Sequence, residues 1–318
     1  MPPGAAESAP VTVAELQLAW QAVRAGAFRS QPHLGTEMWP GGAGAAGLVG
    51  EPVIMVAGAH GWSGTSTAAL LIADAAARRG APVRIVDAAM PARSGFAAAA
   101  ATEHGLDETG RWRRGSRDGV TVQRLAQSVH RPGAVPAPLT AQDGTVTVVD
   151  MGWPVTDLLQ QLGGGHWLGT LLRAAPLVLT ARGTAPGLRH VEAAVEALKV
   201  VRDPGTTVVL ALLGSRTLPR PLSTATATSA GAAAQAAHRG QLLVTVPDRA
   251  ALAAAGLTPA PLPRQLHPAG DQLLALTTHP DAATERWSRP AGSDHRLGMH
   301  LISRFSTQLA THRKDDQR

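Results

Sequence analysis

The sequence predicts an α/β fold with a doubly wound, mainly parallel sheet and helices on both of its faces. Short continuous apolar runs, such as Val53–Ala57 and Thr145–Val149, are typical of strands that are buried on both faces. Helical segments such as Ala68–Arg79 alternate with these runs, which favours parallel strands joined by helices. Asp87 and Asp150 follow strands directly, so they are expected at the carboxyl edge, where such sheets bind ligands.

The regular pattern begins at Glu51 and continues along most of the chain. The patterns predict further strands at 83–86, 120–125, 177–180, 207–213 and 242–246, and a second long helix at 187–200. Residues 92–118 are rich in Ala, Gly and Arg and show little periodicity, and residues 221–238 predict a weak helix or a mobile segment.

The two ends of the chain differ from this middle region. Residues 11–28 have helical periodicity, residues 29–50 are rich in Gly and Pro, and residues 297–309 predict a last helix. We therefore expect an N-terminal helix and linker at 1–50, an α/β domain at 51–280, and a C-terminal helix and tail at 281–318.

The composition narrows the classes of function. The chain has 318 residues, no cysteine and a net charge of +6, and its only lysines are Lys199 and Lys314. Disulfides and thiolate metal sites are excluded, and a cytoplasmic location is expected. No secretory signal and no apolar run of membrane-spanning length are evident. The arginines are scattered, so DNA binding is a weak expectation.

The stretch A-H-G-W-S-G-T-S-T, Ala59 to Thr67, lies between the first strand and the following helix. A phosphate-binding loop needs small residues, a helix N-terminus, a lysine and a hydroxyl that holds magnesium. Gly64 and Ser66 stand at the second glycine and hydroxyl positions, whereas Thr65 stands at the lysine position. The stretch predicts a phosphate loop that lacks its lysine.

Residues from about 53 to about 278 resemble the ParA/MinD family of deviant P-loop ATPases. The resemblance rests on five segments in the family's order: H-G-W-S-G-T-S-T, R-I-V-D-A-A-M-P-A-R-S-G, V-T-V-V-D-M-G-W-P, the strand, loop and helix at 177–198, and V-T-V-P-D. It implies a P-loop fold, binding of ATP with magnesium, a homodimer with an unidentified protein partner, and a role in partitioning or positioning in a bacterial cell.

Several residues depart from the family's pattern. Both lysines of its K-G-G-x-G-K-[ST]-T loop are absent, because His60 and Thr65 stand in their places, and Trp62 replaces a glycine. The strand at 207–213 also lacks the asparagine that the family places near adenine. The loop has therefore lost the positive charge that stabilises phosphoryl transfer, and we expect hydrolysis to be weak or absent.

The resemblance and the loop chemistry together indicate the candidate residues. Nucleotide-binding candidates are the loop residues His60, Gly61, Trp62, Ser63, Gly64, Thr65, Ser66 and Thr67. Ser66 and Asp150 are the candidates for a magnesium site, and Asp87, Arg93 and Arg182 are weak candidates for a catalytic role. The purely structural interpretations of these residues are a tight glycine turn, an aspartate that caps a turn, and a histidine that only makes hydrogen bonds.

Three functions remain open at this point. The first is a degenerate ParA/MinD-like protein that binds ATP and magnesium weakly or conditionally and acts as a spatial-organisation or regulatory scaffold. The second is an active ATPase in which an arginine replaces the lost lysine. The third is a nucleotide-free interaction module whose empty phosphate pocket is filled by Trp62.

Overall fold

The computed structural model describes residues 48, 52–162, 165–214 and 231–278, which all lie in the unit Pro40–Arg318. The expected helices at 11–28 and 297–309 lie outside these residues, as does the expected linker at 29–50 apart from Leu48. None of the helices in the described ranges is long and apolar enough to cross a membrane.

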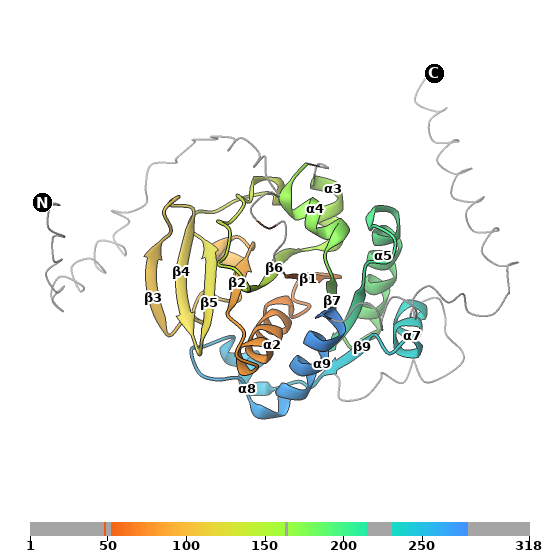
Figure 1. The fold of residues 1–318 in the computed structure, drawn as a ribbon. Coiled ribbons are helices and arrows are strands. Elements are labelled where there is room, and N and C mark those ends of the chain that lie inside the picture. Colours follow the sequence, from red (N-terminus) through yellow and green to blue (C-terminus); the bar gives the residue numbers. More distant parts are fainter. Residues whose placement is uncertain (1–47, 49–51, 163–164, 215–230, 279–318) are drawn as a thin grey trace, which may run out of the picture. The chain divides into compact units, whose positions relative to one another are not determined.

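The described strands form one sheet of nine strands in the order β3-β4-β5-β2-β6-β1-β7-β8-β9 (Figure 1). Neighbouring strands from β5 to β9 in this order are parallel, and the pairs β3–β4 and β4–β5 are antiparallel. This confirms the expected mainly parallel α/β sheet. The strands are β1 Val53–Gly58, β2 Val83–Asp87, β3 Thr102–Leu106, β4 Trp112–Arg117, β5 Val120–Leu125, β6 Val146–Pro154, β7 Leu177–Arg182, β8 Val208–Leu213 and β9 Leu243–Val246.

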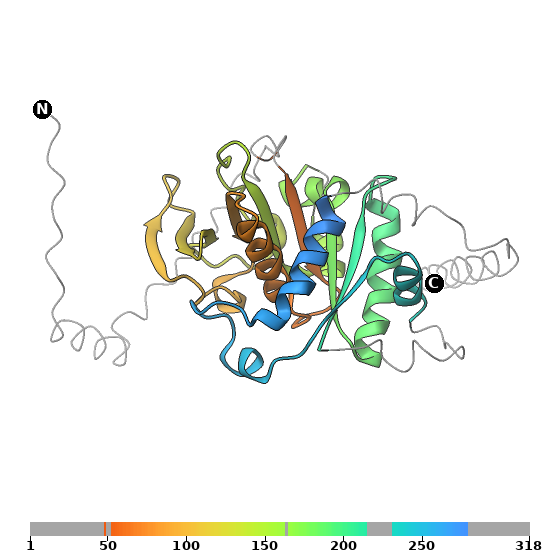
Figure 2. The ribbon, with the colours of Figure 1, turned by 60° about the horizontal axis from the view of Figure 1, so that its bottom comes forward.

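Helices cover both faces of this sheet (Figures 1 and 2). Helices α2 and α9 pack on each other and on one face, whereas α3, α5 and α7 cover the other face. The described helices are α2 Thr65–Arg78, α3 Val155–Gln161, α4 Trp167–Ala174, α5 Ala185–Val201, α7 Ala232–Arg239, α8 Ala250–Ala255 and α9 His267–Thr278, with short 3-10 turns η2 Pro91–Arg93, η3 Pro132–Ala134 and η4 Arg264–Leu266.

The core explains why these elements form. All six residues of β1 are buried, as expected for a strand with helices above and below it. Helix α2 buries an alanine- and leucine-rich face against the sheet and against α9. At that contact the Cβ of any residue in place of Gly270 would lie 2.5 Å from the Leu71 carbonyl oxygen, so glycine allows the two helices to approach. Trp112, Trp153 and Trp167 are buried in the same core, as expected from the sequence.

Residues 92–118, which show little periodicity in the sequence, contain a hairpin of strands β3 and β4. The burial of strand β4 does not alternate regularly, because Trp112 and Gly115, three positions apart, are both buried and Arg113 is exposed. Arg117 is also buried, where it donates hydrogen bonds to the carbonyls of Thr258 and Ala260. A glycine and a charged residue at buried positions hide the alternating apolar pattern that identifies a strand.

Other expectations differ from the structure in extent. Helix α2 begins at Thr65 rather than Ala68, because Gly64 is its N-cap. Strand β6 continues to Pro154, beyond the expected end at Val149. Within 221–238 the described part forms the start of helix α7. Helices α3, α4, α8 and α9 had no counterpart among the expected elements. Their short, alanine-rich or glycine-interrupted sequences give weak periodic signals.

Candidate phosphate-loop site

Residues 59–64 form the loop that joins β1 to α2 at the carboxyl edge of the sheet. Gly64 is the N-cap residue of α2, and no side chain caps this helix, in contrast to α5, whose first turn bonds the Thr184 hydroxyl. The backbone N–H groups of the first turn of α2, together with the helix dipole, therefore face the loop as donors for an anion. This arrangement matches the phosphate loop predicted from the sequence.

Gly64 is required by the geometry of this turn. Its φ is 90°, a left-handed value that side-chain-bearing residues rarely adopt, and an added Cβ would lie 2.1 Å from Cδ2 of Leu213. Gly61 differs, because nothing lies within 4 Å of the position of an added Cβ. The backbone conformation and the neighbouring Leu213 therefore require glycine at position 64, whereas there is space for a side chain at position 61.

Ser66 and Asp150 lie together directly beneath the loop. The Ser66 hydroxyl in the first turn of α2 donates a hydrogen bond of 2.6 Å to Oδ2 of Asp150 on β6. Oδ1 of Asp150 accepts a bond from the Gly152 amide at 3.1 Å. Both residues were the predicted magnesium candidates, and the fold places them in contact although they lie 84 positions apart.

Asp87 lies beside this pair. It is the last residue of β2 and the register partner of Asp150 on β6, and both side chains are completely buried. Oδ1 of Asp87 accepts a bond from the Ala89 amide at 3.0 Å, and Oδ2 accepts one from the Ser94 hydroxyl at 2.5 Å. The sheet register therefore brings the candidate magnesium residue and a candidate catalytic residue side by side.

Burial sets the protonation of these carboxyl groups. Burial and, second, the negative charge of Asp150 together raise the pKa of Asp87 to about 8, against the hydrogen bonds from Ser94 and Ala89. Burial also raises the pKa of Asp150, opposed by hydrogen bonds from Ser66, Gly152 and Thr65. Two adjacent buried carboxyl groups do not readily ionise together, so this pair holds a proton near neutral pH.

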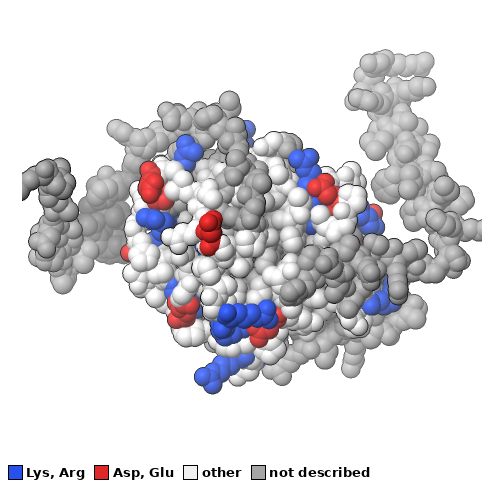
Figure 3. Space-filling view, in the orientation of Figure 1, with Lys and Arg blue, Asp and Glu red and all other residues white. Residues whose placement is uncertain are grey.

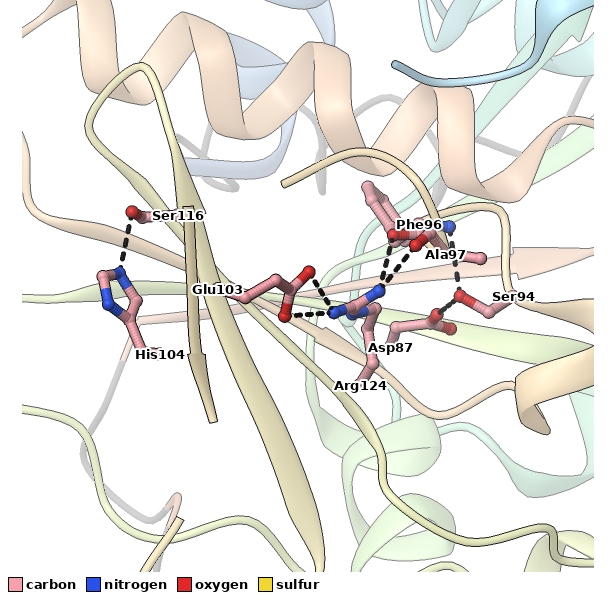
Figure 4. A network of polar contacts seen from close by, with 8 residues as sticks. All are labelled: Asp87, Ser94, Phe96, Ala97, Glu103, His104, Ser116 and Arg124. Atoms are coloured by element: carbon pink, nitrogen blue, oxygen red, sulfur yellow. Dashed lines mark hydrogen bonds and ion pairs between the residues drawn. The ribbon is translucent and has the colours of Figure 1, made fainter. Parts of the chain in front are cut away.

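The segment after β2 covers the cluster, as Figure 4 shows for its outer part. The Ser94 hydroxyl, besides its bond to Asp87, accepts a bond from the Phe96 amide at 3.1 Å. A Cβ added to Gly95 would lie 2.3 Å from the Ser66 hydroxyl oxygen, so the backbone at Gly95 rests directly on Ser66. Ser94 and Gly95 are parts of the site that the sequence interpretation did not single out, although they belong to the quoted P-A-R-S-G motif.

Neither residue at the two lysine positions supplies a cation to the loop. Nε2 of His60 accepts a bond of 3.3 Å from the Arg182 amide, and its Nδ1 lies 2.6 Å from the Gly61 carbonyl. These two contacts suit the tautomer with the ring N–H on Nδ1. Thr65 turns its hydroxyl towards Asp150. His60 instead anchors the loop to β7, and its ring lies 5.1 Å from that of His190.

Ser63 provides a second anchor to β7. Its buried hydroxyl lies 2.8 Å from the Thr180 hydroxyl, and the backbone of Ala59 also bonds the Thr180 carbonyl. Neutral hydrogen bonds therefore fix the loop at both ends. The purely structural interpretation of His60 as a hydrogen-bonding residue agrees with its contacts to the Arg182 amide and the Gly61 carbonyl.

Trp62 projects away from the loop. Its side chain is 96% exposed, and its φ of 62° is a left-handed value that is uncommon for a bulky residue. The expectation that Trp62 fills a vacant phosphate pocket is therefore wrong. The hydrogen bonds of His60 and Ser63 on either side hold the backbone that points this indole outwards.

The two candidate arginines lie on opposite sides of the site. Arg93 is exposed in η2. Arg182 ends β7, and its guanidinium lies beside Gly214 and 3.7 Å from a carboxylate oxygen of Asp248. Its side chain remains 42% exposed. Both are therefore accessible, and neither contacts the Ser66–Asp150 pair in this conformation of the described residues.

The donor set fits a magnesium–nucleotide group. Hydroxyl and carboxylate oxygens are the ligands that magnesium prefers, and Ser66, Asp150 and Asp87 supply them within one buried cluster. The amides of the α2 N-terminus lie next to this cluster and suit phosphate oxygens. Among the described residues, no group of three or more His, Cys, Asp or Glu side chains could hold a metal ion by itself.

The chain was compared with known proteins. No protein-family model matches it, and no curated protein sequence matches it. Among solved structures it is similar to a ParA family ATPase from Chlorobium tepidum, with 14% identity, a TM-score of 0.44, and coverage of 74% of this chain and 96% of that one. A plasmid partition protein from Borrelia burgdorferi has 8% identity, a TM-score of 0.42 and coverage of 72% and 98%.

A third similar structure is the septum site-determining protein MinD from Pyrococcus horikoshii, complexed with Mg-ADP. It has 12% identity, a TM-score of 0.39 and coverage of 78% of this chain and 100% of that one. The solved structures that resemble this chain thus include ParA- and MinD-type proteins, the family that its motifs resemble.

Proposed function

We propose that this chain binds a magnesium–nucleotide at the loop between β1 and α2, weakly or conditionally, and acts as a regulatory or spatial-organisation scaffold with little hydrolysis. The observation that supports this most strongly is the uncapped N-terminus of α2 next to the bonded pair Ser66–Asp150. An anion site and a magnesium ligand set are combined there. Such a combination suits a phosphate ester with its metal ion.

Each residue has a defined task in this proposal. The amides at the start of α2 bind phosphate oxygens, and Ser66 and Asp150 hold the magnesium ion, which neutralises phosphate charge when it is bound. Asp87 lies beside them and accepts or holds a proton within the acid pair. Ser63 and His60 keep the loop in place without contributing a formal charge.

The expectation of weak hydrolysis follows from the lack of positive charge. Phosphoryl transfer is accelerated by cations placed on the transferring group. At the two lysine positions the loop has a neutral histidine and a threonine whose hydroxyl faces Asp150. Binding through amides and metal therefore remains feasible, while catalysis lacks its usual cation.

Calorimetric titration with ATP and magnesium tests the proposal. We expect binding in the micromolar to millimolar range, loss of binding in Ser66→Ala and Asp150→Asn, and no change in the matched controls Ser128→Ala and Asp143→Asn. The two control residues are exposed. Absence of binding by the wild-type protein contradicts the proposal and leaves the interaction-module function.

The active ATPase is a second candidate because Arg93 and Arg182 are accessible at the edge of the site. Steady phosphate release that falls at least tenfold in Arg93→Gln or Arg182→Gln supports it. Release that is unchanged in both variants rules out the arginine substitution. Release below the detection limit, together with binding, supports the scaffold.

The projecting indole of Trp62 suits contact with another protein, including a second copy of this chain. Sedimentation with and without magnesium–ATP tests the expected homodimer, and Trp62→Ser should weaken it. A monomer under both conditions contradicts the homodimer. DNA binding is a weaker proposal, because basic and acidic side chains are interspersed on the face in Figure 3. If DNA binding occurs, its affinity should fall steeply as salt is added.

A further inference from the structure

Arg124 continues the row of charged residues at the carboxyl edge of the sheet. It lies on β5 as the register partner of Asp87 on β2, which in turn pairs with Asp150 on β6. Residues in register on neighbouring strands point to the same face, so the row has two carboxyl groups followed by one guanidinium. The Arg124 side chain is only 12% exposed.

The contacts of Arg124 extend in two directions (Figure 4). Nη1 donates to the carbonyl oxygens of Ala97 at 2.8 Å and Phe96 at 3.3 Å. Nη2 donates to both carboxylate oxygens of Glu103 on β3, at 2.6 and 2.7 Å. Hydrogen bonds between charged groups are stronger than neutral ones, so this side chain joins the segment after β2 to the edge strand.

The other end of that segment rests on the candidate site. Ser94 bonds Asp87, and the backbone at Gly95 lies against Ser66. Residues 94–97 thus form a four-residue bridge with the loop hydroxyl and the acid pair at one end and Arg124 at the other. A bridge this short transmits a displacement of Ser66 to the Arg124 contacts, because few backbone dihedral angles are available to absorb it.

Strand β3 depends on this link. All five of its residues are exposed, and among the described strands it pairs with β4 alone. The Glu103 side chain passes over Gly115 of β4 to reach Arg124 on β5, and the Cδ of Glu103 lies 3.5 Å from where a Cβ on Gly115 would stand. An exposed edge strand with little burial opens easily, so one charged anchor strongly affects its stability.

We propose that Arg124 is a positioning residue that couples the Ser66–Asp150 site to edge strand β3 through residues 94–97. Displacement of residues 94–97 from Ser66 loosens β3, and release of β3 loosens the cover of Ser66. Coupling between two sites is reciprocal. The ligand-free coupling stands alone, whereas its effect on nucleotide affinity rests on the proposed function.

The first experiment needs no ligand. Gly95→Ala places a Cβ against the Ser66 side chain and forces residues 94–97 to move. We expect amide hydrogen exchange of residues 102–106 to rise about tenfold, the change expected for loss of a charge-assisted hydrogen bond. The control is Gly165→Ala, where nothing lies within 4 Å of the added Cβ. Unchanged exchange in β3 of Gly95→Ala overturns the proposal.

The second experiment starts from Arg124. Arg124→Gln should raise exchange in both residues 94–99 and β3, whereas Arg124→Lys, which keeps a charge for Glu103 but has no planar fork, should protect β3 more than residues 94–99. The control is Arg113→Gln. Arg113 is an exposed residue on β4 and the register partner of Arg124 on β5. An equal rise in Arg113→Gln, or no rise in Arg124→Gln, contradicts the proposal.

The third measurement links the proposal to the nucleotide. Magnesium–ATP should slow amide hydrogen exchange of β3 in the wild-type protein and in Arg113→Gln. Arg124→Gln should lose this protection while its melting temperature stays that of the wild-type protein. A purely structural role of Arg124 would alter the melting temperature without removing this response. If the wild-type protein binds no nucleotide, the proposed function fails while the two ligand-free experiments still decide the coupling.

Discussion

The two halves of the carboxyl edge are stabilised by different chemistry. On the side of β6, β2 and β5, Asp150, Asp87 and Arg124 lie in register, and hydrogen bonds link Asp87 to Ser94 and Arg124 to Ala97. On the side of β1 and β7, neutral bonds from Ser63 and His60 hold the loop. The loop contacts therefore involve hydroxyl, imidazole and backbone groups, whereas the opposite half contains two carboxyl groups and a guanidinium. The stability of the two halves should consequently respond differently to a change of pH.

The largest expected effect concerns a glycine in the charged half. Gly152 has a φ of 63°, and an added Cβ would lie 2.3 Å from Cβ and 2.4 Å from Cα of Ala89. We expect Gly152→Ala to lower the free energy of unfolding by about 3 kcal/mol or more, as a backbone clash combined with left-handed strain does. Gly61→Ala in the neutral half should change it by less than about 0.5 kcal/mol. Thermal and denaturant unfolding measure both, and equal losses would remove the contrast.

The second effect is a pH dependence that only the charged half should show. The pKa of Asp87 is raised from 3.8 to about 8 by burial and by the Asp150 charge. The folded state therefore keeps a proton that the unfolded state releases, so this stability is complete below about pH 4 and is lost as pH rises towards 8.

Asp87→Asn removes this loss. The unfolding free energy of Asp87→Asn should exceed that of the wild-type protein by an amount that grows between pH 4 and pH 8, to about 1–3 kcal/mol. Denaturant unfolding at several pH values measures the gain, with the exposed Asp143→Asn as control. A gain that is constant with pH would show that Asp87 is ionised throughout.

The third effect belongs to the neutral half. Ser63→Ala removes the shorter of the two hydrogen bonds of the buried Thr180 hydroxyl, which keeps its 3.4 Å bond to the Ala57 carbonyl, and should lower the unfolding free energy by about 1 kcal/mol. A double-mutant cycle with Thr180→Val should give a coupling energy of similar size at pH 5 and at pH 8, because neither hydroxyl titrates in that range. A coupling that changes with pH would indicate an ionised group within this half.

The smallest effect is expected at Trp62. Its side chain is 96% exposed and its φ of 62° suits glycine, so Trp62→Gly relieves strain and removes little packing. The unfolding free energy should change by less than about 0.5 kcal/mol. The tryptophan fluorescence that Trp62→Gly loses relative to the wild-type protein should be a part that acrylamide quenches efficiently. A large destabilisation would mean that the indole packs within the chain.

Much of the parallel sheet could be predicted from sequence because its strands are buried on both faces. Continuous apolar runs gave β1, β2 and β6 to within a few residues at their starts. The hairpin β3–β4 could not be predicted, because the buried Arg117 and Gly115 break the apolar alternation. Ser66, Asp150 and Asp87 could be predicted as candidates because each lies beside an apolar strand run or at the start of a helix in the sequence. Arg124 carries no comparable signal, since its role arises from its neighbours in the sheet.

By itself the sequence determined that a glycine turn, a helix start and two aspartates beside apolar strand runs follow one another along the chain, because these features are local. Tertiary structure alone decided that Trp62 points outwards, that the Arg182 amide bonds His60, and that Arg124 bonds Glu103 on the edge strand. These outcomes depend on which strands become neighbours and on their register. Hydrogen bonds and burial between segments distant in the chain exist only once the sheet has formed.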